Sequence, residues 1–191
     1  MTCLRDFLSE ERGGPTIDFV MVLLPVLMFI FTIIDFTLAF HMTSNAQKAA
    51  QLGARLAAVA DPVHTLVPAT NELNPTNGQL GDACYQAAGD ACLTPATLVW
   101  DCDGASLAAA CDSDAFALIH NRVQDLYPLV DRARIRITYR YMRLGTAGGP
   151  FVPLVSVTIK ERPSPVQMLT FVGLLDLRAV TASALGEDLV S

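Results

Sequence analysis

The fold is decided by one long apolar stretch, Phe19-Val-Met-Val-Leu-Leu-Pro-Val-Leu-Met-Phe-Ile-Phe-Thr-Ile-Ile-Asp-Phe-Thr-Leu-Ala-Phe40. Apart from Pro25, only two threonines and Asp35 interrupt its apolar side chains. About 20 such residues in a helix cross the hydrocarbon core of a bilayer. A core helix of a small protein rarely stays apolar on every side for so long, and the apolar part of a cleavable signal is usually about 7 to 15 residues. The stretch therefore predicts a single transmembrane helix.

The helical composition continues well beyond the apolar stretch. From Pro15 to Ala60 only Pro25 interrupts it, and Asp61-Pro62 ends it. Such a helix reaches roughly 70 Å, about twice the thickness of the hydrocarbon core, so its second half must stand outside the membrane. Small residues recur there at three- and four-residue steps: Ala46, Ala49, Ala50, Gly53, Ala54 and Ala57. This stripe favours close packing on the chain's own domain, with contact to neighbouring subunits as the alternative.

The rest of the chain is long enough for one modest domain. Residues 63–81 are rich in proline and polar residues and predict an irregular connection. Residues 112–127 predict a helix capped by Asp112 or Ser113. Its apolar face is expected to hold Phe116, Ile119, Val123, Leu126 and Tyr127.

Two segments with alternating apolar and polar residues predict an antiparallel hairpin. They are residues 134–141 and 155–160, separated by a loop at 145–150. Residues 97–100 and 177–185 are expected to add strands, and the apolar segment 166–175, too short to span a bilayer, is expected to cover the core. The fold class is therefore α+β: a long N-terminal transmembrane helix followed by a small antiparallel-sheet domain with one or two packed helices.

The cysteines indicate on which side of the membrane the domain lies. Cys84, Cys92, Cys102 and Cys111 all follow the apolar stretch, whereas Cys3 precedes it. An even set favours disulfides in an oxidising compartment, hence an exported domain. Three pairings are possible, and the short separations favour Cys84 with Cys92 and Cys102 with Cys111. A metal site is not expected, because no CxxC pair occurs and no histidine is close by.

The charged residues argue against several classes of function. A net charge of −6 does not suit binding to nucleic acid. No catalytic or cofactor-binding motif occurs, so neither a catalytic residue nor a cofactor is predicted. The aspartates at 101, 103, 112 and 114 favour a solvated acidic face, with a calcium site as the alternative. The arginines at 132, 134, 136 and 140 are expected on one wet face of a strand, with a binding surface as the alternative.

The junction before the apolar stretch carries the functional signal. A charged leader ends at Gly13, and Asp18 lies just inside the helix. A carboxylate at the membrane centre costs about 2.5 to 3.5 kcal/mol, so a partner is expected. Cleavage after Gly13 would free the α-amine of Gly14, which has a pKa of about 8 and can neutralise Asp18 of the next subunit. This predicts a leader over residues 1–13, a helix over 14–60 and an extracytoplasmic domain over 61–191.

These features resemble the TadE-like minor pilins, or pseudopilins, of the tight-adherence (Tad or Flp) pilus system. The resemblance is carried by Glu11-Arg12-Gly13, Asp18-Phe19, Leu23-Leu-Pro25, Ile33-Ile-Asp35-Phe36 and the alanine-rich segment that ends at Ala60. It implies cleavage between Gly13 and Gly14 by a prepilin peptidase. It also implies a role in assembly for Asp18, which stands where glutamate is typical, and for Phe19.

The resemblance further implies a structural protein rather than an enzyme. Its expected partners are prepilin peptidase, other minor pilins, the major Flp pilin, the inner-membrane pilus platform and the lipid bilayer. Its expected location is the bacterial inner membrane, crossed once, with a periplasmic C-terminal domain that could also enter an extracellular pilus. Two alternatives remain open: a signal-anchored extracytoplasmic enzyme or ligand-binding domain, and a permanently membrane-held adaptor of the same machine.

Overall fold

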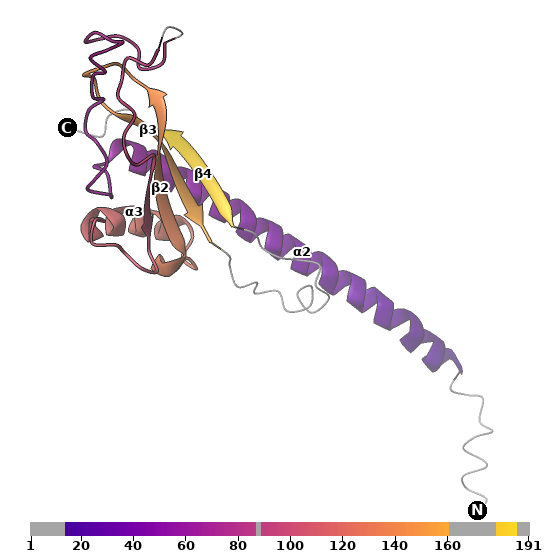
Figure 1. The fold of residues 1–191 in the computed structure, drawn as a ribbon. Helices are drawn as coiled ribbons and strands as arrows, with labels where there is room; N and C mark the ends of the chain where they lie inside the picture. Colours follow the sequence, from indigo (N-terminus) through magenta and orange to yellow (C-terminus); the bar gives the residue numbers. More distant parts are fainter. Residues whose placement is uncertain (1–13, 87–88, 161–178, 187–191) are drawn as a thin grey trace, which may run out of the picture. The chain divides into compact units, whose positions relative to one another are not determined.

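The computed structural model describes residues 14–86, 89–160 and 179–186 (Figure 1). Among these residues, 14–41 belong to one compact unit and the others to a second. The predicted leader, with Cys3 and Gly13, and the apolar segment 166–175 lie outside the described residues. The second unit contains the sheet and is described first.

Regular structure follows the predicted order along the chain. The elements are helix α2 (Gly14–Val59), strand β1 (Val99–Asp103), helix α3 (Ser113–Leu126), the short 3-10 helix η2 (Arg132–Arg134) and strands β2 (Ile135–Leu144), β3 (Val152–Ile159) and β4 (Val180–Leu185). The strands form one antiparallel sheet in the order β1-β2-β3-β4. The predicted α+β class is therefore confirmed, and so is the hairpin of β2 and β3.

The sheet has one apolar face and one polar face, because side chains alternate along each strand. Residues in register form apolar rows on the inner face: Trp100, Tyr139, Val155 and Ala184 in one, and Cys102, Ile137, Val157 and Ala182 in the next. The two alanines of β4 are half-buried and the other six residues are buried. The hydroxyl of Tyr139 is also buried and accepts a hydrogen bond from the Val63 amide at 3.1 Å. This bond ties the connection after α2 to the middle of the sheet.

The small-residue stripe of α2 packs against the inner face of the sheet, as expected for the chain's own domain. Its six residues are all buried. A Cβ atom added to Gly53 would lie 2.8 Å from Val123 Cγ2 of α3 and 3.4 Å from Val157 Cγ1 of β3. Figure 1 shows this end of α2 crossing behind the strands. Small side chains therefore allow the helix backbone to approach both elements closely.

Helix α3 confirms its predicted cap and most of its apolar face. The Asp112 side chain accepts hydrogen bonds from the amides of Asp114 and Ala115, at 2.8 and 3.1 Å. The three central apolar residues, Phe116, Ile119 and Val123, are buried. The prediction was wrong for Leu126, which is 48% exposed because it is the last residue of the helix, one turn beyond the last buried position, Val123. Tyr127 is buried but lies outside the helix, as its C-cap.

Strand β1 also differs from its prediction. It runs over Val99–Asp103 and not over residues 97–100, because Asp101 and Asp103 lie on the polar face of the sheet, where a strand accommodates charged side chains. The connection before it, residues 61–98, has no regular helix or strand among its described positions. It is held by isolated bridges, including Thr70 to Pro150 and Leu73 to Cys92. The buried Asn71 amide donates to the carbonyls of Leu144 and Pro150, at 3.2 and 3.0 Å.

Replacing Gly53 by leucine tests the close approach of α2 to the sheet. Several extra heavy atoms must enter a site where one Cβ already meets the β-branched Val123. Overpacking of this kind costs about 1 to 3 kcal/mol. We expect Gly53→Leu to lower the free energy of unfolding of the domain by that amount, measured by urea denaturation of the detergent-solubilised chain. The control is Lys48→Leu on the exposed side of the same helix, and an equal loss in both variants would contradict the packing.

Candidate functional site

The first half of α2 exposes apolar side chains on every side. Its most apolar 18 residues have a mean hydropathy of 2.7, and none of them is buried. Residues 17–34 are all exposed, and the hydroxyls of Thr32 and Thr37 donate to the carbonyls of Met28 and Ile33 at 2.7 and 2.8 Å. The helix thus satisfies these two threonine hydroxyls with its own backbone carbonyls. It is long and apolar enough to cross a membrane.

The predicted assembly residues lie at the start of this helix. Gly14 is the first residue of α2, and Asp18 and Phe19 follow in its second turn with exposed side chains. Asp35 lies in the same apolar half, where its side chain is partly buried and its Oδ2 atom has no hydrogen-bond partner among the described residues. The apolar half of the helix therefore carries two carboxylates, Asp18 near its start and Asp35 further along.

The cysteines form two local disulfides in the second unit. Cys84 is bonded to Cys92 and Cys102 to Cys111, with Cα atoms 4.7 and 5.9 Å apart. This is the pairing that the short sequence separations favour. The second bond joins β1 to the residue immediately before the Asp112 cap of α3. It therefore links the sheet edge covalently to the start of a core helix.

The acidic and basic residues form one network across the strands rather than separate faces. Asp103 on β1 contacts Arg136 Nη2 on β2 at 2.9 Å and Lys160 Nζ at 2.6 Å. The Lys160 ammonium, with help from the Ala105 amide and Arg136, lowers the pKa of Asp103 to about 2. The neighbouring Asp101 accepts a hydrogen bond of 2.6 Å from the Thr138 hydroxyl.

Two of the four arginines are not on the predicted strand. Arg132 and Arg134 belong to the 3-10 helix η2, because the Arg134 amide bonds to the Asp131 carbonyl and the chain turns before β2 begins. The Arg132 guanidinium instead lies over the Phe116 ring, 5.4 Å from its centroid. The expected row of four arginines was therefore wrong, and β2 carries Arg136 and Arg140 on its outer face together with Arg143 near its end.

The rest of the outer sheet face is lined by hydroxyl groups. Ser156 pairs with Ser183 at 3.0 Å and Thr158 with Thr181 at 2.9 Å, across β3 and β4. The aspartates that suggested calcium mostly have other roles: Asp112 caps a helix, Asp101 binds a hydroxyl and Asp103 binds two cations. In the described part of the chain, no three histidine, cysteine, aspartate or glutamate side chains gather as metal ligands would.

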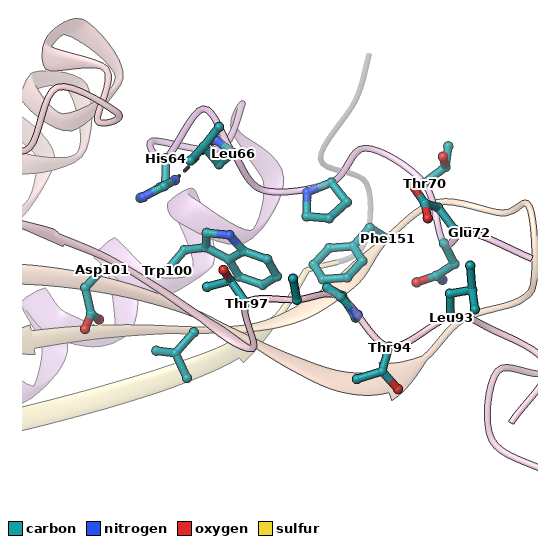
Figure 2. A pocket seen from close by; sticks show the side chains of 15 residues that line it. His64, Leu66, Thr70, Glu72, Leu93, Thr94, Thr97, Trp100, Asp101 and Phe151 are labelled. Atoms are coloured by element: carbon teal, nitrogen blue, oxygen red, sulfur yellow. Dashed lines mark hydrogen bonds between the residues drawn. The ribbon is translucent and has the colours of Figure 1, made fainter. Parts of the chain in front are cut away.

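A pocket of about 540 Å³ lies between the 64–72 connection and the 93–101 segment (Figure 2). Trp100 and Phe151 lie at its centre, with ring centroids 5.7 Å apart and nearly perpendicular planes. Nδ1 of His64 accepts a hydrogen bond from the Leu66 amide at 3.2 Å, and burial lowers the pKa of His64. Sequence reasoning missed this pocket. The single tryptophan, on a short strand, was its one visible signal.

The comparison with known proteins bears on the helix rather than on the pocket. Residues 14–55 match the family model described as TadE-like protein. Residues 14–55 are therefore a TadE-like segment. No curated protein and no solved structure matches it.

The match covers the N-terminal helix and leaves the sheet domain unassigned. It begins at Gly14, where α2 begins, and ends four residues before the end of α2. Asp18, Phe19 and Asp35 therefore lie inside it, whereas both disulfides and the pocket lie outside. The family is a pilus component, so the match associates the chain with the Tad pilus system and with partners from it.

Replacing Asp103 by asparagine tests the polar network around this carboxylate. The change removes a carboxylate that binds two cations, and we expect a loss of about 1 kcal/mol in the free energy of unfolding at pH 7. Because folding lowers the pKa of Asp103, its contribution is present above pH 4 and is lost as the pH falls through about 2. The difference between the wild type and Asp103→Asn should therefore vanish near pH 2.

Asp125→Asn is the control for this measurement. Asp125 pairs with Arg122 at 3.8 Å, and both side chains are more than half exposed, so its replacement should have almost no effect. A pH-independent effect of Asp103→Asn, or an equal effect of Asp125→Asn, would contradict the network.

Proposed function

We propose that the chain is a structural minor pilin, or pseudopilin, that takes part in initiating, assembling or stabilising a Tad (Flp) adhesive pilus. The observation that carries this proposal is the family match, which begins at Gly14. Gly13 immediately before it is the residue after which a prepilin peptidase would cut. Residues 1–13 would then be a leader, 14–60 the membrane helix and 61–191 the periplasmic domain.

Cleavage and assembly would be linked by charge. A cut after Gly13 creates an α-amine with a pKa of about 8, which is mostly protonated at neutral pH. Asp18 lies one helical turn further along, exposed within an apolar helix, where an unpaired carboxylate is unfavourable. The amine of one subunit and Asp18 of the next would neutralise each other inside the membrane. Phe19 beside it would pack against the neighbouring helix.

The periplasmic location of the domain is supported by its two disulfides, since such bonds persist in oxidising compartments. The chain would thus cross the bacterial inner membrane once. Prepilin peptidase, the major Flp pilin, other minor pilins and the inner-membrane platform would be its partners there. A permanently membrane-held adaptor would share the same family match, and it differs from the leading proposal in keeping residues 1–13.

Replacing Asp18 by asparagine tests the role of the carboxylate in assembly. We expect Asp18→Asn to be inserted and cleaved normally, but to reduce the number of surface pili about tenfold or more, because the amine of the neighbouring subunit loses its counter-charge. Asp18→Glu keeps the charge and should retain most pili. The count is made by electron microscopy of cells expressing each variant at equal levels. Normal piliation by Asp18→Asn would contradict the proposal.

The oxidation state of the cysteines tests the location of the domain. Chains extracted from native membranes in the presence of an alkylating reagent should carry no alkyl group if cleaved, because Cys3 is lost with the leader and the other four are paired. After reduction the same chains should carry four. Cys102→Ser is the control, because it frees Cys111 for one alkyl group. Four alkyl groups without reduction would contradict a periplasmic domain.

A further inference from the structure

Strand β1 forms an edge of the sheet. Some of its backbone N–H and C=O groups therefore point away from its neighbour β2. The Leu98 carbonyl accepts from the Tyr141 amide, and the Gly104 amide donates to the Ile135 carbonyl, each at 2.9 Å. In an antiparallel pair, hydrogen-bonded residues alternate, so the backbone groups of Val99, Asp101 and Asp103 face the opposite side. The Asp103 carbonyl is used there by the Ser106 amide at 3.1 Å. The Asp101 carbonyl lies 3.7 Å from Cys111 Sγ. Among the described residues, the open part of the edge is therefore centred on Val99 and the amide of Asp101.

The pocket beside Trp100 runs along this open part. Val99 and Asp101 line it, and the facing wall includes Leu66 and Pro68. Figure 2 shows Trp100 and Phe151 between the two walls. Val99 is 40% exposed and Leu66 68% exposed, although edge strands are commonly protected by charge or by a covering segment. A volume of about 540 Å³ is within the usual range for sites that bind ligands.

The charged residues around the pocket determine which side chains an extended segment would need in order to bind along β1. Asp101 and Glu72 are the acidic residues of its lining, which includes neither lysine nor arginine. On the outer face, however, Arg140 stands opposite Val99 in the register of β1 and β2. A basic side chain is therefore favoured opposite Asp101 and disfavoured opposite Val99. On the inner face, the residue between these two positions would meet Trp100.

We propose that the free edge of β1 binds an extended segment of a partner protein, which adds to the sheet as a further strand. The segment carries a basic residue opposite Asp101, a bulky apolar residue against Trp100 and an uncharged residue opposite Val99. Main-chain hydrogen bonds to Val99 and Asp101 hold it, and the alternate side chains give specificity, as in other cases of strand addition. This inference uses only the sheet domain and does not rest on the proposed function.

The test uses the full chain in detergent micelles and the peptide acetyl-Thr-Lys-Phe-Val-Thr-amide. When this peptide pairs with β1 in the antiparallel direction, its lysine, phenylalanine and valine stand opposite Asp101, Trp100 and Val99. Antiparallel pairing is also the more stable arrangement per residue. Trp100 is the single tryptophan of the chain, so its fluorescence reports on this pocket, and calorimetry measures binding in parallel. We expect saturable binding, with empty micelles as the blank.

Two matched peptides and two variants decide whether strand addition is the mode of binding. Methylation of the valine amide removes a main-chain donor, and glutamate in place of lysine reverses the charge, so each peptide should bind at least about tenfold more weakly. Asp101→Asn retains an acceptor for Thr138 and should weaken binding of the lysine peptide about fivefold. Asp125→Asn should leave it unchanged. Absence of binding by calorimetry at about 1 mM, or equal binding of the methylated peptide, would overturn the proposal.

Discussion

The close approach of α2 to the sheet at Gly53 is the contact on which the rest of the domain depends. The helix backbone lies so near the other elements that a single Cβ added to Gly53 would crowd Val123 of α3 and contact Val157 of β3. The alanines around Gly53 are buried by the same approach, and they join the inner rows of the sheet in one core. The small-residue stripe therefore fixes how an N-terminal helix and a C-terminal sheet form one domain.

The same helix meets a different requirement in its first half. There the apolar side chains are exposed on every side, and the threonine hydroxyls bond to carbonyls of the helix itself. Such a surface is stable in hydrocarbon and unfavourable in water. A single element thus carries an apolar segment suited to lipid and a small-residue stripe suited to a protein core. Substitutions in the two halves should consequently affect different properties, namely assembly in one and folding in the other.

Features set by local periodicity could be predicted from the sequence. The length of α2, the hairpin of β2 and β3, the cap at Asp112 and the two disulfides all depend on residues close together in the chain. Features that depend on contacts between distant residues were harder to predict. Asp101 and Asp103 were expected on a solvated acidic face, yet they pair with Thr138, Arg136 and Lys160 on the outer face of the sheet. The pocket escaped prediction for the same reason, because bridges and hydrogen bonds between the 64–73 connection and distant segments bring its walls together.

The central claim is that the TadE-like helix begins, in the mature protein, at Gly14. The most direct test is the N-terminal sequence of the membrane-extracted chain, determined by mass spectrometry in the native host and in cells without prepilin peptidase. A start at Gly14 in the first and at Met1 in the second is the predicted result. The account would be contradicted if both strains kept Met1. It would also be contradicted if the chain began at the same residue beyond the apolar stretch in both strains.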